Sequence, residues 1–266
     1  MENIVGLIAA ITIGVSLGLI GGGGSILTVP ALVYLMHVEP VLATAYSLFV
    51  VGIASLIGSF SYMKKGLVSY RTAVVFAIPS LTAVFLTRKY LVPAIPSEIL
   101  HLGDFVLTKD LAIMLFFAVI MVAAAYSMIR SGKKKDLEEE EIKFNYPMIL
   151  LEGAIVGVLT GIVGAGGGFL IIPALVILAR LPMKMAVGTS LLIIAVKSLI
   201  GFTGDISEQI IDWNFLMLFS GFAIGGIVIG SFASKYVSAG KLKGAFGWFV
   251  LVMGAYIIAR ELMVTI

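Results

Sequence analysis

Apolar stretches long enough to approach the thickness of a lipid bilayer follow one another along almost the whole chain. A transmembrane helix needs about 20 mainly apolar residues, and the runs 41–62, 72–91 and 214–233 reach that length. Only 12% of the residues are charged, against roughly 25% in soluble domains. A transmembrane barrel would show alternating segments of about ten residues instead. The sequence therefore predicts an all-α polytopic membrane protein.

The chain also contains an internal repeat. The stretch "GLIGGGGSILTVPALV" at 18–33 aligns with "GIVGAGGGFLIIPALV" at 161–176, an offset of 143 positions, and the match continues without a gap to Gly58 and Gly201. An ungapped match of this extent indicates an internal duplication. We therefore divide the chain into a first transmembrane repeat, a charged cytoplasmic linker and a second transmembrane repeat, which cover 1–130, 131–146 and 147–266.

Each half contains five apolar segments. They lie at 4–20, 25–36, 41–62, 72–91 and 111–129 in the first half and at 147–163, 169–179, 185–203, 214–233 and 244–262 in the second. Two of them, 25–36 and 169–179, are too short to cross a hydrocarbon core about 30 Å thick. Each of these short segments is expected to form a hairpin with the preceding run, with the glycine-rich turn at membrane depth.

Loop charges predict the orientation of the chain, because Lys and Arg concentrate in cytoplasmic loops. The loop 63–71 contains three basic residues and the linker four, whereas the loop 204–212 contains none. Threading the chain accordingly places the linker in the cytoplasm and both termini outside. Corresponding loops then face opposite sides, so the halves are inverted repeats, as in many secondary transporters.

The glycine stretches have the features of an anion site. Irregular backbone at membrane depth is tolerated where it lines a cavity, and N–H groups at a helix N-terminus bind anions. The residues predicted to contact an anion are Gly22, Gly23, Gly24 and Ser25 in the first half and Ala165, Gly166, Gly167 and Gly168 in the second. The alternative is that these glycines only allow close helix packing.

Other polar residues within the apolar segments extend this predicted site. Lys197 is a basic residue well inside an apolar run, and an intramembrane charge suggests function; alternatively its side chain reaches the membrane surface. Ser47 and Ser190 occupy matched positions, preceded by Tyr46 and Thr189. Their hydroxyls are expected to face the same centre, unless they bond back to their own helices.

The duplicated glycine–proline motif, followed in each half by an A-x-x-x-S-L element, resembles the TauE/SafE sulfite exporter family of membrane transporters. The stretch "AVGTSLLIIAVKS" at 186–198 is similar to the family's GTS element. The resemblance implies export or exchange of sulfite, sulfonates or related small anions across the cell membrane. The first half differs from the pattern: Ala45 and Tyr46 stand where the second half has Gly188 and Thr189, and Tyr46 is expected to narrow one wall of the site.

We therefore expect a secondary transporter of a small sulfur-containing anion that works by alternating access, with proton coupling left open. The alternatives are a passive anion channel and a transporter of another solute such as a carboxylate. An intramembrane enzyme is disfavoured because both histidines lie in predicted loops, and a nucleotide-driven pump because the chain has no P-loop. No metal, cofactor or nucleic acid is expected; the expected partners are the anion and the lipid bilayer, and a homo-oligomer is left open.

Overall fold

The computed structural model describes residues 2–102, 105–131, 146–163, 168–177, 181–206, 209–234, 236 and 239–265. The helices of the first half are α1 (Glu2–Ile20), α2 (Thr28–Met36), α3 (Pro40–Lys64), α4 (Tyr70–Leu86), α5 (Val92–Ala94) and α6 (Lys109–Ser131). Those of the second half are α7 (Tyr146–Val163), α8 (Gly168–Ile177), α9 (Met183–Thr203), α10 (Trp213–Ala233) and α11 (Ala239–Thr265). A 3₁₀ helix, η1 (Gly21–Leu27), joins α1 to α2, and a π-helical turn, η2 (Thr87–Leu91), joins α4 to α5.

The predicted apolar segments coincide with helices, which confirms the all-α prediction. Among the described residues, four helical stretches are long and apolar enough to cross a membrane: Pro40–Lys64, Tyr70–Ala94, Lys184–Thr203 and Trp213–Ala233. Large apolar side chains such as Ile8, Val74 and Leu151 are more than half exposed. Such side chains suit contact with lipid rather than water. The chain is therefore a polytopic membrane protein.

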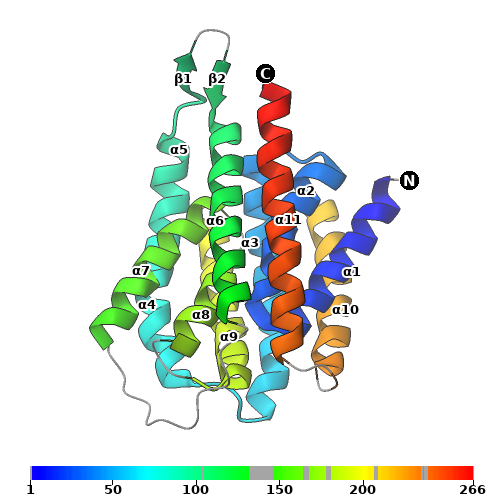
Figure 1. Ribbon diagram of the computed structural model, residues 1–266, viewed down its shortest axis with the longest axis vertical. Helices are drawn as coiled ribbons and strands as arrows, with labels where there is room; N and C mark the ends of the chain where they lie inside the picture. Colours follow the sequence, from blue (N-terminus) through cyan, green and yellow to red (C-terminus); the bar gives the residue numbers. More distant parts are fainter. Residues whose placement is uncertain are drawn as a thin grey trace.

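The residues between the predicted segments 72–91 and 111–129, where no helix is expected, contain a small antiparallel hairpin. Its strands are β1 (Glu98–Leu102) and β2 (Phe105–Thr108), and His101 pairs with Val106. The hairpin projects beyond the helices at the end of the molecule where α11 finishes (Figure 1).

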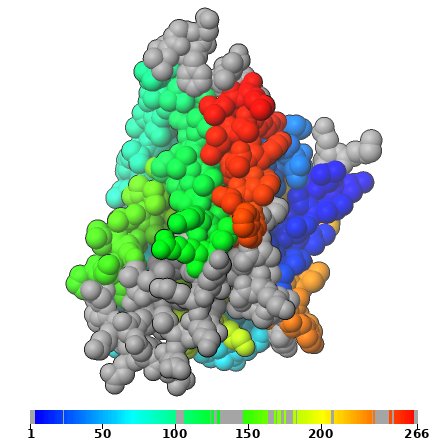
Figure 2. Space-filling view, viewed as in Figure 1, coloured from blue at the N-terminus to red at the C-terminus, as the bar shows by residue number. Residues whose placement is uncertain are grey.

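The helices at the centre of the molecule are α3 and α9, which pack against each other and are the most buried of the four long apolar stretches. Around them, α1 packs against α10 and α4 against α7, while α10 also contacts α3 and α4 also contacts α9. Figure 2 shows α6 in green and α11 in red side by side on one face. At the offset of 143 positions α1 corresponds to α7, α3 to α9 and α4 to α10. The contact of α1 with α10 therefore matches that of α7 with α4, and the contact of α3 with α10 matches that of α9 with α4.

The matched contacts extend to single residues. A Cβ atom on Gly14 of α1 would collide with the carbonyl oxygen of Ala223 on α10. A Cβ atom on Gly157 of α7 would stand 2.6 Å from the carbonyl oxygen of Ser80 on α4. Gly14 aligns with Gly157, and Ser80 aligns with Ala223. Both halves therefore use the same close helix crossing, which small residues make possible in membrane bundles.

The two ends of the molecule differ in which parts of the chain they contain. In Figure 1 the start of α1 and the end of α11 lie towards the upper end, which we name the terminal end. The end of α6 and the start of α7 lie towards the opposite end, which we name the linker end. The predicted path of the chain across the membrane requires the two termini to lie at one end and the linker at the other. Which of these ends faces the cytoplasm stays a prediction.

Candidate functional site

The first glycine stretch interrupts the helix where the sequence predicts a break. Helix α1 ends at Ile20, and Gly21 has a φ of 72°, a left-handed conformation that glycine adopts without a steric penalty. The chain then continues as the 3₁₀ helix η1 before α2 begins at Thr28. The short helix therefore begins three residues later than the predicted segment 25–36.

The first glycine stretch lies against Gly168, the last of the predicted site residues of the second stretch, inside the protein. Gly22 of η1 lies against Gly168, the first residue of α8, so closely that a Cβ atom on either would collide with the Cα atom of the other. A Cβ atom on Gly21 would stand 3.4 Å from the hydroxyl oxygen of Ser190 on α9. Close packing at Gly22 and Gly168 agrees with the packing alternative for these two glycines, and it also brings one described residue of each predicted anion-binding stretch into contact.

Of the remaining predicted residues of the glycine stretches, the structure describes those of the first half only. Gly24 packs against Ser16 and Leu17 of α1, and the Ser25 hydroxyl donates to the carbonyl oxygen of Gly22 at 2.7 Å. The backbone of Gly23 belongs to η1. Ala165, Gly166 and Gly167 lie outside the described residues.

The matched serines are both fully buried. The Ser190 hydroxyl donates to the carbonyl oxygen of Val187, 2.8 Å away on its own helix. The Ser47 hydroxyl has no hydrogen-bond partner among the described residues. A buried hydroxyl without a hydrogen-bond partner costs free energy. Of the two serines, Ser47 is therefore the one whose hydroxyl is available to bind a ligand.

The residues before these serines connect the two halves. The Tyr46 hydroxyl accepts a hydrogen bond from the backbone N–H of Asp212 at 2.8 Å, and the Thr189 hydroxyl accepts one from the backbone N–H of Ser69 at 2.9 Å. Asp212 and Ser69 are the N-cap residues of α10 and α4. Both hydroxyls therefore hold the start of a helix from the other half, and a contact with substrate stays a prediction.

Lys197 on α9 is fully buried. Its ammonium group donates to the hydroxyl oxygen of Thr160 on α7 at 3.0 Å, and no carboxylate among the described residues contacts it. The side chain does not reach the surface, so the snorkelling alternative does not describe this structure. An isolated buried cation is unfavourable unless an anion compensates it.

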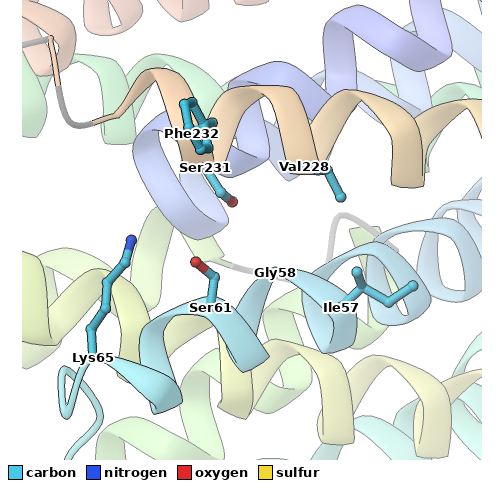
Figure 3. A pocket seen from close by; sticks show the side chains of 7 residues that line it. All are labelled: Ile57, Gly58, Ser61, Lys65, Val228, Ser231 and Phe232. Atoms are coloured by element: carbon cyan, nitrogen blue, oxygen red, sulfur yellow. The ribbon is translucent and has the colours of Figure 1, made fainter.

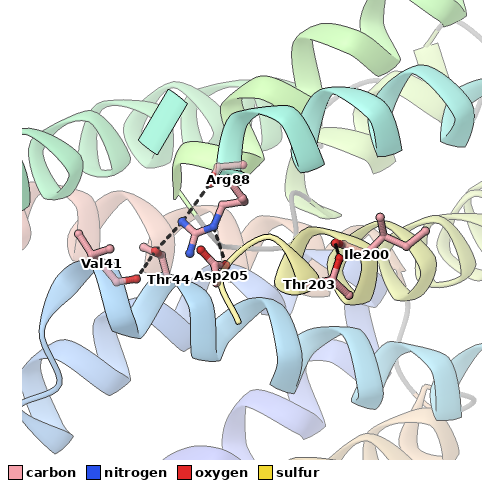
Figure 4. A network of polar contacts seen from close by, with 7 residues as sticks. Val41, Thr44, Arg88, Ile200, Thr203 and Asp205 are labelled. Carbon is pink, nitrogen blue, oxygen red and sulfur yellow. Dashed lines mark hydrogen bonds and ion pairs between the residues drawn. The ribbon is translucent and has the colours of Figure 1, made fainter. Parts of the chain in front are cut away.

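A second buried cation, Arg88, was not among the predicted site residues. It lies in the π-helical turn η2, and its side chain is completely buried. Its Nε donates to Asp205 at 2.8 Å and its Nη1 donates to the Thr44 hydroxyl at 2.9 Å (Figure 4). Nη1 also donates to the carbonyl oxygen of Gly161 at 3.2 Å. This burial has little signal in the sequence, because Arg88 is followed directly by another basic residue, Lys89, at the end of an apolar run.

Asp205, which the sequence analysis places in an outer loop, is buried beside Arg88 directly after α9. Burial raises the pKa of the Asp205 carboxyl above its ordinary value, and the neighbouring guanidinium of Arg88 opposes that rise. The pair joins the two halves, since Arg88 belongs to the first and Asp205 to the second.

A pocket of about 240 Å³ opens between α3 and α10 near the linker end. It is lined by Ile57, Gly58, Ser61, Lys65, Val228, Ser231 and Phe232. Figure 3 shows Ser61 and Ser231 facing one another across it, with Lys65 at one end. Ser231 occupies the position in the second half that Arg88 occupies in the first. The pocket includes neither Lys197 nor a described residue of the glycine stretches.

The helices are long and apolar, and their exposed side chains suit contact with lipid. These features define a polytopic α-helical membrane protein, and two basic side chains, Arg88 and Lys197, are buried within it. A model of the family described as "Sulfite exporter TauE/SafE" matches residues 6–257. The chain therefore belongs to the TauE/SafE sulfite exporter family.

Relatives with known sequences support the same assignment. A "Probable membrane transporter protein" of Xylella fastidiosa (strain 9a5c) is 31% identical over 255 residues, which cover 94% of this chain and 92% of the relative. The "Probable membrane transporter protein YunE" of Bacillus subtilis (strain 168) is 29% identical over 239 residues, covering 84% of each chain. No solved structure matches this chain significantly. The protein is a membrane transporter, and its family and relatives are not described as enzymes.

Proposed function

We propose that the protein is a secondary transporter that exports a small sulfur-containing anion, such as sulfite or an organosulfonate, from the cell by alternating access. The observation that carries the proposal is Lys197, a fully buried cation that contacts a threonine hydroxyl and no described carboxylate. A transported anion would supply the missing negative charge. The printed description of the family, sulfite exporter, supports sulfur oxyanions as the first substrates to test.

The proposed site lies where the two halves meet at the centre of the protein. The meeting of Gly22 and Gly168 beside Ser190, together with the unpaired Ser47, supports placing it there. The remaining predicted residues of the site, Gly23, Gly24, Ser25, Ala165, Gly166, Gly167, Tyr46 and Thr189, belong to the same proposal. Because the glycines are packed together in this structure, anion entry requires the halves to move apart.

Alternating access is supported by the matched halves. Corresponding helices make corresponding contacts, so a rocking of one half against the other would exchange the environments of the two ends. Towards the terminal end the buried ion pair of Arg88 and Asp205 joins the two halves. At the linker end the position matched to Arg88 is Ser231, which lines an open pocket. The cytoplasmic linker, external termini, inverted repeats and location in the cell membrane are parts of this proposal, and proton coupling is left open.

The experiment that tests this function is anion flux from proteoliposomes. Vesicles containing the purified protein are loaded with sulfite under anaerobic conditions, and efflux is compared with that of thiosulfate, sulfoacetate, taurine, sulfate and acetate. We expect saturable efflux of a sulfur oxyanion or sulfonate that is accelerated by the same anion outside. The Lys197→Met variant should lose it, and the Lys89→Met variant, which removes an exposed charge outside the pocket, should keep it.

Three results would contradict the proposal. Flux that neither saturates nor responds to external anion would indicate a channel. Preference for acetate would indicate a carboxylate transporter. Sulfite efflux that continues in Lys197→Met at the unchanged rate would remove the observation on which the proposal depends.

A further inference from the structure

Two buried cations, one from each half, reach adjacent residues of the same helix. Lys197 on α9 donates to the Thr160 hydroxyl at 3.0 Å, and Arg88 in η2 donates to the carbonyl oxygen of Gly161 at 3.2 Å. Neither side chain has any exposed surface. Two basic side chains therefore contact the end of α7 inside the protein, just before the second glycine stretch.

The negative charge at this place is smaller than the positive charge. Asp205 contacts Arg88, and no other described carboxylate contacts either cation. The Nη2 group of Arg88 is also buried without an acceptor among the described residues, although a guanidinium has five N–H donors. Buried charges and buried donors are normally compensated. A small anion between Arg88 and Lys197 would satisfy both deficits at once.

The local backbone positions Arg88 for such a role. In the π-helical turn η2, Thr87 and Arg88 are buried, whereas the next two residues, Lys89 and Tyr90, are exposed. Single π-helical turns within helices occur frequently at functional sites. Guanidinium groups also suit oxyanions, because two parallel N–H donors match two oxygens.

We propose that Arg88 and Lys197 together bind the oxygens of the transported anion, and that Asp205 takes the place of the anion on Arg88 when the site is empty. The inference rests on the proposed function and names the groups that recognise the substrate. Because Arg88 holds Asp205 and Gly161 of the other half, exchange of Asp205 for the anion would also release a contact that joins the two halves towards the terminal end. Binding would thereby favour opening.

The test is the affinity of purified variants for sulfite, measured by titration calorimetry under anaerobic conditions, with acetate as the comparison anion. Arg88→Gln alone leaves Asp205 buried without its partner and risks misfolding. The double variant Arg88→Gln, Asp205→Asn removes both charges and keeps a polar side chain at each position, so no buried charge is left without a partner and the protein should fold. We expect it to bind sulfite at least about tenfold more weakly, a loss of about 1.4 kcal/mol. The matched control is Lys89→Gln, which removes an exposed charge from the neighbouring residue and should leave the affinity unchanged.

The variant Asp205→Asn tests the exchange separately. If the carboxylate competes with the anion, its removal should make sulfite binding severalfold tighter, since Arg88 then has no internal partner of opposite charge. Unchanged or weaker binding in this variant would overturn the exchange with Asp205. Unchanged affinity in the double variant would overturn the role of Arg88. Absence of sulfite binding in the unaltered protein would instead overturn the proposed function, and this inference with it.

Discussion

The hydroxyl of Tyr46 lies 2.8 Å from the backbone nitrogen of Asp212 and accepts its hydrogen bond. At the matched position of the second half, the Thr189 hydroxyl accepts from the backbone nitrogen of Ser69 at 2.9 Å. Tyr46 and Thr189 differ chemically, yet at matched positions of the two halves each accepts a hydrogen bond from a backbone N–H of the other half. Each connects a central helix of one half to the N-cap of a helix in the other. The departure from the family pattern at Tyr46 preserves this connection.

Removal of the Tyr46 hydroxyl should destabilise the protein. In Tyr46→Phe the backbone N–H of Asp212 loses its acceptor, and an unsatisfied partly buried donor costs about 1–3 kcal/mol. We expect a lower midpoint of thermal unfolding in detergent, measured by tryptophan fluorescence. Tyr70→Phe removes a hydroxyl from an exposed tyrosine and should leave the midpoint unchanged. Equal midpoints for both variants would show that the bond does not contribute. A change in anion affinity in Tyr46→Phe would support the predicted contact with substrate.

The helices and the matched halves could be predicted because they depend on local patterns. Apolar runs report helices directly, and the offset of 143 positions identifies α3 with α9 and α4 with α10. The hairpin also has a local signal in the sequence: in "EILHLGDFVLT" a Gly-Asp pair separates two short apolar runs, which is typical of a hairpin.

The polar contacts of the centre could not be predicted, because they depend on tertiary packing. Arg88 is followed by Lys89 at the end of an apolar run, and the packing of the other helices around this turn buries the first and leaves the second exposed. Asp205 has the sequence surroundings of an ordinary loop acid. The contact of Gly22 with Gly168 likewise joins residues that are far apart in the chain.

Enlargement of Gly22 should separate the two halves at their point of contact. A methyl group there would collide with the backbone of Gly168, and overpacking costs about 1–3 kcal/mol. We expect Gly22→Ala to unfold at a lower temperature than the unaltered protein. The control is Gly221→Ala on α10, where a Cβ atom meets no atom within 4 Å and helix propensity favours alanine. An unchanged midpoint in Gly22→Ala would mean that the glycines are not held together in solution.

Neutralisation of Lys197 should change stability and anion response in opposite directions. Methionine has a similar length without the charge, and replacing buried charge with apolar atoms is often stabilising. Without anion, Lys197→Met should therefore unfold at the same or a higher temperature. Added sulfite should raise the midpoint of the unaltered protein by mass action but not that of the variant. A variant that unfolds earlier and still responds to sulfite would assign Lys197 a structural role through Thr160.

The predicted orientation can be measured directly because the natural chain contains no cysteine. Ile210→Cys would place a thiol in the loop before α10, where the side chain is 95% exposed, and Lys65→Cys would place one in the exposed turn after α3. If the termini lie outside, a membrane-impermeant maleimide should label Ile210→Cys in intact cells and Lys65→Cys only after permeabilisation. The reverse pattern would invert the orientation while leaving the threading intact. Labelling of both positions from one side would contradict the threading, because the crossings by α4, α6 and α9 between them are odd in number and must place the two positions on opposite faces.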